Sequence, residues 1–175
     1  TVQVDYSGTP DSGHRAFEFD SAESKPLIWS LSEPFGARTW FPIKDTPSDK
    51  ADSASIKFTV PVPMKAISNG TLEQVVDLGS KQRFEWFEHH PIAIYLISIA
   101  AHDYTEQSQV INTVAGPLEL TNWSYAGNSI AAAGALDLTE SMVLAFEEDF
   151  GAYPFMDEKY GQVQFNWGGG MEHQT

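Results

Sequence analysis

The first two thirds of the chain alternate apolar and polar positions in short segments. Residues 56–60, Ile-Lys-Phe-Thr-Val, have a period of two and are followed by two prolines. Residues 82–88 repeat this period, with Phe84, Trp86 and Glu88 on one face. A period of two places successive side chains on opposite faces of an extended chain, so both segments are predicted to be β-strands.

Two further features support a β structure. Asn69-Gly70 separates the short runs 65–68 and 71–75. Asn-Gly tolerates positive φ angles, so we predict a hairpin whose strands are these two runs. Residues 92–101 are apolar nearly throughout, which is typical of a strand that is buried on both faces.

Helix signals appear only in the last third of the chain. Asp137 and Glu140 have the spacing of a capping box, and Gly151 is a stop signal. An earlier start through residues 131–133 stays open. Apolar residues with helical spacing follow the capping box, namely Leu138, Met142, Ala145, Phe146 and Phe150. Residues 160–165 are predicted to form another strand.

The distribution of these elements predicts a mainly β protein in two parts. Strands and hairpins with few helix signals indicate an antiparallel β saddle or sandwich over residues 1–116. A different, α+β layer is predicted over residues 117–175.

Composition narrows the classes of partner. The net charge of −14 at pH 7 argues against nucleic acid and against anionic membrane surfaces. It suits cationic partners, including peptides with a free amino terminus, but it also serves general solubility. The chain has no cysteine, which excludes disulfides and thiolate chemistry.

Membrane insertion and location are addressed only weakly by the sequence. The longest apolar run, residues 92–101, is too short to span a bilayer, so we expect no membrane insertion in this segment. The chain begins with Thr1 and shows no signal peptide, so we expect a processed or excised piece of a longer protein. The compartment is left open.

The segment Gly168-Gly169-Gly170-Met171-Glu172 is the first candidate for chemistry. Glycines leave the backbone accessible for pairing with a peptide, and Glu172 could bind the ammonium group at the peptide's end. The alternative is a glycine-rich loop with a solvated glutamate. The residues alone leave both open.

A second candidate lies in the Pro- and aromatic-rich loop Ser32–Pro42. Glu33 could be a ligand carboxylate, with Arg38 as its buried counter-ion. The alternative is a purely structural corner.

Other catalytic motifs are missing from the sequence. His89 and His90 are adjacent, so their side chains diverge on a strand, and no HExxH pair is present. A zinc site within this chain is therefore not expected. There is also no Gly-x-Ser-x-Gly elbow and no phosphate-binding loop.

Taken in order, the motifs resemble those of the aminopeptidase N and leukotriene-hydrolase family of zinc peptidases. The motifs are Tyr6–Pro10, Ser32–Pro42, Asp45–Ala51, Val60–Pro61, Ser68–Gly70, Phe146–Phe155, Tyr160–Val163 and Gly169–His173. Each is weak alone, but the ordered set covers nearly the whole chain.

The resemblance implies a fold and a division of labour. Residues 1–116 look like the family's N-terminal β saddle without its opening strands, and residues 117–175 like the truncated start of a thermolysin-like catalytic domain. Glu172 falls on the glutamate that binds the substrate's α-amine. Gly169, Gly170 and Met171 fall on the adjoining substrate-binding motif, where the glycine backbone lies along the peptide. Glu33 falls on the residue that shares in binding the amine.

The resemblance further implies a zinc aminopeptidase that removes N-terminal residues from peptides. The zinc ligands and the catalytic residues of the family lie beyond residue 175, so we expect this piece to be inactive and to bind no zinc. Its partners would be peptides with a free N-terminus and the remainder of its own catalytic domain. His173 departs from the asparagine that is commonest at that position. A non-catalytic peptide-binding module and an epoxide hydrolase of the same family are the alternatives.

Overall fold

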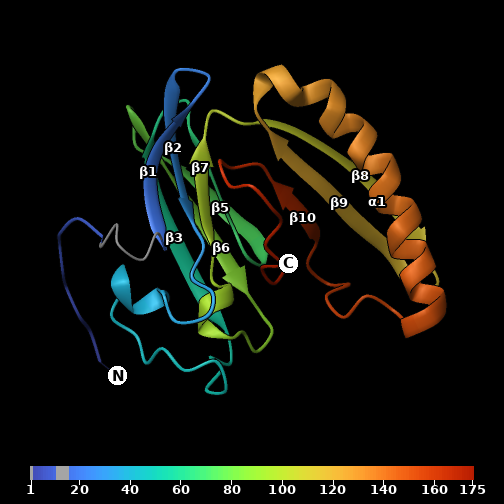
Figure 1. Ribbon diagram of the computed structural model, residues 1–175, viewed down its shortest axis with the longest axis horizontal. Helices are drawn as coiled ribbons and strands as arrows, with labels where there is room; N and C mark the ends of the chain where they lie inside the picture. Colours follow the sequence, from blue (N-terminus) through green and yellow to red (C-terminus); the bar gives the residue numbers. More distant parts are fainter. Residues whose placement is uncertain (1, 11–15) are drawn as a thin grey trace.

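The N-terminal strands form two antiparallel sheets (Figure 1), as a computed structural model covering residues 2–10 and 16–175 shows. The first sheet has the order β1 (Phe17–Ala22), β2 (Lys25–Ser30), β7 (Ile99–His102) and β4 (Lys65–Ser68). The second has the order β3 (Ala54–Pro61), β6 (Lys81–Glu88) and β5 (Thr71–Asp77). The short helices η1 (Ala37–Thr39) and η2 (Ile94–Leu96) lie in the connections. We call these two sheets the saddle.

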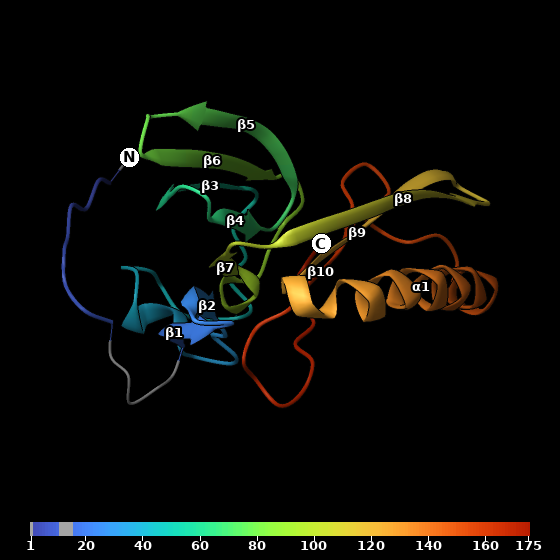
Figure 2. The same cartoon turned by 90° about the horizontal axis from the view of Figure 1, so that it is seen from above.

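The C-terminal part forms a third sheet that is covered by one long helix (Figure 2). In this sheet β8 (Thr105–Thr113) pairs antiparallel with β9 (Gly116–Ser124), and β10 (Tyr160–Val163) pairs parallel with β9. The helix α1 (Ser129–Phe150) follows η3 (Ala126–Asn128) and packs on β8 and β9. The predicted boundary after residue 116 therefore falls within the β8–β9 hairpin, and it stays a prediction.

Two hydrophobic clusters hold these layers together. The larger cluster fills the saddle, around Trp29 and Trp86, and it also takes in Trp123 from the end of β9. The smaller one lies between the third sheet and α1 and includes Leu118 and Leu136. Since Trp123 packs edge-on against Trp86 with 6.2 Å between ring centroids, the two parts share an apolar contact.

Several predictions from the hydrophobic pattern are confirmed. Residues 56–60 lie in β3 and residues 82–88 in β6. Phe84, Trp86 and Glu88 are all buried on the same face of β6. The mainly β class, with antiparallel sheets followed by an α+β layer, is likewise confirmed.

The predicted hairpin at Asn69-Gly70 is wrong. Residues 65–68 pair with β7, whereas residues 71–75 lie in β5, which pairs with β6. Gly70 does have a positive φ of 75°, and a Cβ there would approach the carbonyl oxygen of Phe87 to 2.0 Å. The turn therefore has the expected backbone, but it carries the chain from one sheet to the other.

The apolar segment at residues 92–101 is not one strand. It contains the helix η2 and then β7, all of whose residues are buried. The expectation of burial was correct for β7, but strand length could not be read from an unbroken apolar run.

The capping box at Asp137 and Glu140 does not mark the start of α1, whereas the earlier start left open through residues 131–133 is close to the observed one. α1 begins at Ser129, so Asp137 and Glu140 lie in its interior. It ends as predicted at Gly151, which has a φ of 86°. Four of the apolar residues noted after Asp137 face away from the sheet and are more than half exposed, namely Leu138, Met142, Phe146 and Phe150.

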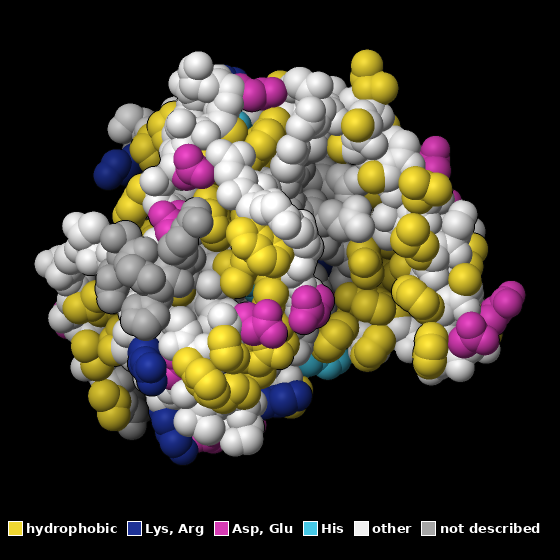
Figure 3. All heavy atoms as spheres, in the orientation of Figure 1, with side chains coloured by type: hydrophobic (Ala, Val, Ile, Leu, Met, Phe, Trp, Pro, Cys, Tyr) yellow, Lys and Arg dark blue, Asp and Glu magenta, His cyan; other side chains and the backbone are white. Residues whose placement is uncertain are grey.

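The exposed apolar side of α1 is visible in Figure 3. By length and composition, residues 126–150 could cross a membrane, with a mean hydropathy of 1.3. This is weak evidence, because the opposite face of the same helix packs on the third sheet through Leu136, Thr139 and Val143. The expectation of no membrane insertion rested on residues 92–101 and did not consider this helix.

Candidate functional site

A cleft of about 970 Å³ lies between the saddle and the third sheet. The surface is hollowed there in Figure 3. On the saddle side the cleft is lined by Ile67, Ser68, Leu96 and Ser98. The opposite side consists of β10 and the segment that follows it, including Trp167 and residues 169–175. This cleft, which brings apolar and polar side chains of both parts together, is the candidate site.

The predicted substrate-binding residues Gly169, Gly170, Met171 and Glu172 all line this cleft. Glu172 is exposed, so its carboxylate is available to a ligand. No atom of another described segment lies within 4 Å of the position that a Cβ would take at Gly170. At Gly169 such a Cβ would meet the ring of Trp167 at 2.8 Å. The glycine backbone is thus open at Gly170 and covered by an indole ring at Gly169.

Glu33 is placed differently. It is exposed in the loop between β2 and η1, and it does not line the cleft. Arg38 is exposed as well, and its backbone N–H donates to the Asp45 carboxylate, so the expectation of a buried counter-ion is wrong. The structure therefore brings the glycines, Met171 and Glu172 together at the cleft but leaves Glu33 outside it.

A buried lysine lies at the floor of the cleft. The Lys159 ammonium donates to the carbonyl oxygens of Ser68 and Gly70, at 3.2 and 2.6 Å. It also lies 4.9 Å from the centroid of the Trp86 ring, a cation–π distance. Burial lowers the Lys159 pKa to about 8, because the charged form is the one that loses hydration.

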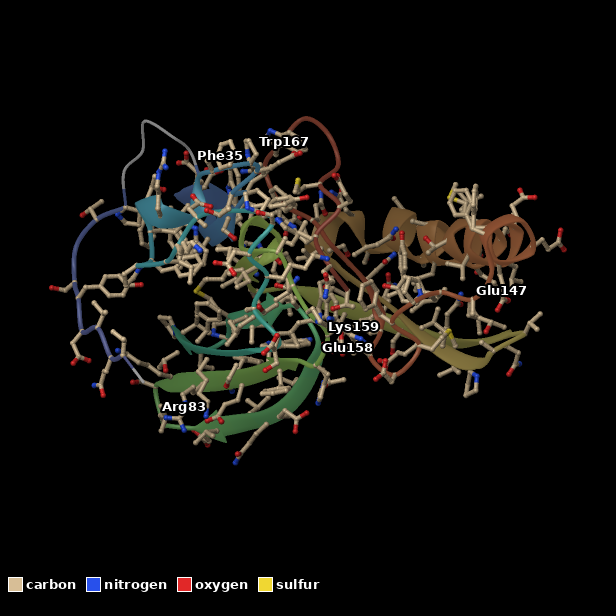
Figure 4. All side chains as sticks on the ribbon, turned by 90° about the horizontal axis from the view of Figure 1, so that it is seen from below. Phe35, Arg83, Glu147, Glu158, Lys159 and Trp167 are labelled. Atoms are coloured by element: carbon tan, nitrogen blue, oxygen red, sulfur yellow. The ribbon has the colours of Figure 1, made fainter. Side chains whose placement is uncertain are left out.

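Two buried carboxylates accompany this lysine. Figure 4 shows Glu158 beside Lys159, between the saddle and the sheet under α1. Glu158 accepts hydrogen bonds from the His89 N–H and ring, and its second oxygen has no partner among the described residues. Glu88 is fully buried, and burial raises its pKa.

The histidines that the structure describes do not assemble a metal site. His89 bonds to Glu158, and His90 bonds to Asp157, which raises the His90 pKa. His173 is largely enclosed beside Glu172, and burial lowers its pKa to about 4. Among residues 2–10 and 16–175, no group of three or more potential ligand side chains could hold a metal ion. These described residues therefore do not fit a zinc ion.

Sequence reasoning missed Trp167, Glu158 and Lys159. A faint signal existed for Glu88, which was noted as an acid on the apolar face of its strand. Nothing comparable marks Lys159, because a lysine directly before a strand normally lies in solvent.

The family follows from the match of residues 1–96, more than half of the chain, to the Peptidase M1 N-terminal domain. This chain belongs to the M1 peptidase family. The ordered motifs of the sequence and the antiparallel saddle agree with that assignment.

Curated relatives extend the similarity past the saddle. Leucine aminopeptidase 2 of Aspergillus terreus is 25% identical over 161 residues, covering 85% of this chain and 24% of that protein. Glutamyl aminopeptidase of Bos taurus is 27% identical over 141 residues, covering 79% of this M1 chain and 14% of the relative. The chain therefore spans at most about a quarter of the length of these two relatives.

Solved structures share the fold. An M1 zinc metallopeptidase mutant of Deinococcus radiodurans, bound to a Tyr-Ser-Ala substrate, matches with a TM-score of 0.67 and 23% identity, covering 78% of this chain and 31% of that one. Legionella pneumophila aminopeptidase A, in complex with aspartic acid, matches with a TM-score of 0.72 and 17% identity, covering 86% and 17%. At these identities the likeness establishes the fold of the M1 chain.

Proposed function

We propose that this chain is the amine-recognising part of a zinc-dependent M1 aminopeptidase that removes N-terminal residues from peptides. The observation that carries the proposal is the placement of Gly169–Glu172 along one wall of the cleft, with the Glu172 carboxylate exposed. The names of the relatives, leucine and glutamyl aminopeptidase, support the same reaction class.

The glycine wall suits a peptide main chain. An extended peptide needs backbone N–H and C=O partners, and Gly170 leaves them uncovered. A terminal ammonium beside Glu172 would form a charge-assisted hydrogen bond, which is stronger than a neutral one. An internal segment of a peptide has no such charge, so the pocket would favour chain ends.

Zinc belongs to this proposal only through the longer protein. The described residues do not fit the ion, so zinc would be bound by residues outside this chain, where it would polarise the scissile carbonyl. We propose that the chain by itself is inactive. We also propose that residues 1–116, as the N-terminal domain, and residues 117–175, as the start of the catalytic domain, recognise substrate.

The exposed apolar face of α1 suits the same arrangement. Leu138, Met142, Phe146 and Phe150 form an apolar stripe that water would cover in this chain alone. We propose that the remainder of the catalytic domain, which the longer relatives contain, packs on this stripe. Glu33 is proposed to assist in amine binding from the saddle.

A titration of this chain tests the proposal. We expect the tripeptide Tyr-Ser-Ala to shift the amide NMR signals of Gly169, Gly170 and Met171. From these shifts, the affinity for its N-acetylated form should be at least about fivefold lower. Glu172→Gln should weaken binding of the free tripeptide by about fivefold or more, because one charge-assisted contact is lost.

Matched controls complete the design. Glu148→Gln changes an exposed glutamate on α1, away from the cleft, and should leave affinity unchanged. Glu33→Gln reports separately on the saddle's contribution. Equal affinity for free and acetylated tripeptide would refute amine recognition. This titration does not separate an aminopeptidase from a binding module without catalysis; those two functions would differ in whether the longer protein contains an HExxH motif.

A further inference from the structure

The turn Asn69-Gly70 does not form a hairpin. Together with Glu88 it forms a buried hydrogen-bonding site for Gln174 and Thr175, which we call the socket. Asn69 is fully buried, and its side-chain oxygen accepts from the Ser98 N–H at 2.8 Å. Its amide nitrogen donates to the carbonyl oxygens of Leu96, at 3.0 Å, and of Gln174. The side chain thus ties the saddle to a residue 105 positions away. A hairpin turn would not require these bonds.

The buried carboxylate of Glu88 is directed at the same distant segment. One of its oxygens accepts from the Gln174 side-chain amide at 3.1 Å and from the His90 N–H at 3.0 Å. Its other oxygen accepts from the Thr175 hydroxyl at 3.2 Å. That hydroxyl in turn accepts from the Gly70 N–H at 2.7 Å. The donor and acceptor roles are mutually consistent, so the network is satisfied without water.

This network attaches one end of the candidate binding segment to the saddle. The other end continues from β10, whose pairing with β9 is extended by the Gln164 N–H donating to the carbonyl of Trp123. Between these anchors, residues 168–173 have no strand or helix pairing of their own. Figure 1 shows the C-terminal end of the chain against the saddle strands. The segment is therefore a strap held at two points, one on each side of the cleft.

We propose that Asn69 and Glu88 are positioning residues, which hold Gln174 and Thr175 and thereby set where Gly168–Glu172 lies along the cleft. This inference rests on the proposed function of that segment. Neither residue would touch the substrate. Their effect on binding would come from keeping the glycine backbone and the Glu172 carboxylate in one arrangement before a peptide arrives.

The energetics favour a sharp effect. Removing the Asn69 side chain would leave the Gln174 and Leu96 carbonyls and the Ser98 N–H without their partners in a buried place. Unpaired buried groups cost free energy. The end of the strap would therefore leave the saddle for part of the time, and its polar groups would form hydrogen bonds to water instead. A strap that spends only part of its time in place lowers the apparent affinity by that same fraction.

His173 supplies a direct reading of the strap's position. Its ring is enclosed when the strap is seated, and burial lowers its pKa to about 4. In Asn69→Ala we expect its NMR titration midpoint to move toward the ordinary 6.5, and the affinity for Tyr-Ser-Ala to fall at least about fivefold. Gln174→Ala removes a contact from the strap alone, so it keeps the test valid if Asn69→Ala fails to fold.

Two matched variants separate positioning from general loss of stability. Asn122→Ala removes another buried asparagine, which donates to the Ala132 carbonyl on α1 and not to the strap. It should leave the His173 midpoint and the affinity unchanged. Glu88→Gln keeps the shape and one oxygen that can accept from Gln174 and from the His90 N–H, so its His173 midpoint and its peptide affinity should stay close to those of the unmodified chain. Glu88→Ala should resemble Asn69→Ala in both.

The outcomes for the socket and for the proposed function are distinguishable. An unchanged His173 midpoint in folded Asn69→Ala and Gln174→Ala would overturn the socket, whatever the peptide result. A moved midpoint with unchanged Tyr-Ser-Ala affinity would also overturn the positioning role. Equal binding of free and acetylated tripeptide by the unmodified chain would instead refute amine recognition. The His173 midpoint would still show whether Asn69 and Gln174 hold the strap against the saddle.

Discussion

Replacing the buried Lys159 by methionine should change how stability depends on pH. In the unfolded chain this lysine keeps its proton up to a pH near 10.5, but in the folded protein only up to about 8. Between these values unfolding takes up a proton, so raising the pH favours the folded state. Methionine fills a similar volume without a titrating group, so Lys159→Met should lack this pH dependence.

The size of the effect follows from the Lys159 pKa. The fall from 10.5 to about 8 corresponds to about 3 kcal/mol, fully regained only near pH 10.5. Between pH 8 and 9.5 we expect a gain of about 1.5 kcal/mol. Higher pH is unsuitable, because burial raises the pKa values of Tyr104, Tyr125 and Tyr153 and their ionisation on unfolding opposes the gain.

Urea unfolding followed by circular dichroism, at intervals from pH 7 to 9.5, measures the effect. The free energy of unfolding of the unmodified chain should rise over this range, and that of Lys159→Met should stay level. Lys57→Met is the control, because Lys57 is half-exposed and pairs with Glu85 at the surface. The pH dependence is the diagnostic, since the variant also leaves the Ser68 and Gly70 carbonyls without a donor. An equal rise in the unmodified chain and Lys159→Met would refute the reasoning.

Two further predictions concern the core and the buried acid. Ile92→Ala should lower the free energy of unfolding by about 2–5 kcal/mol, because the Ile92 side chain is fully buried. The control Val114→Ala, at an exposed turn, should change it by less than about 0.5 kcal/mol. Similar losses for both variants in urea titrations would contradict the packing. Glu88→Gln should raise the free energy of unfolding at pH 7, because the buried Glu88 carboxylate is charged there and its charge destabilises the folded state. The raised Glu88 pKa means that its stabilising contribution is present at low pH and is lost as the pH rises through the folded-state pKa. Thermal unfolding should show this advantage disappearing below about pH 4.5, and an advantage that persists there would exclude the carboxylate as its cause.

Local features of this chain could be predicted where local physics decides them. The period of two over residues 56–60 and 82–88 identified strands, because a strand with one buried face requires it. Gly151 marked the end of α1, because that backbone position needs a positive φ. The mainly β class followed from the same patterns.

The pairing of the strands and the buried face of α1 could not be predicted in this way. Asn-Gly gives a turn in any setting, but here the buried Asn69 side chain bonds to segments far along the chain, and these contacts direct β4 and β5 into different sheets. The helical spacing of Leu138, Met142, Phe146 and Phe150 does not determine which side of α1 is buried, for a related reason. A helix can carry apolar residues on two sides, and only packing on β8 and β9 decided which side is buried.

The candidate site shows the same division. The glycines and Glu172 were recognised from the sequence and from the motif order, since bare backbone beside a carboxylate suits an amino-terminal peptide. The cleft wall that they form, the place of Glu33 outside it, and the buried Lys159 became apparent only in three dimensions.

The sequence by itself therefore determined several strand-forming segments, the end of the helix and the family, and it predicted the chemistry of Gly169–Glu172. Tertiary structure alone decided which strands pair, which face of α1 is buried and how residues 168–175 are held. The physical reason is that periodicity and turn preferences act over a few neighbouring residues. The bonds from Asn69 and Glu88 to Gln174, by contrast, join positions about a hundred residues apart, and they form only once the sheets have packed.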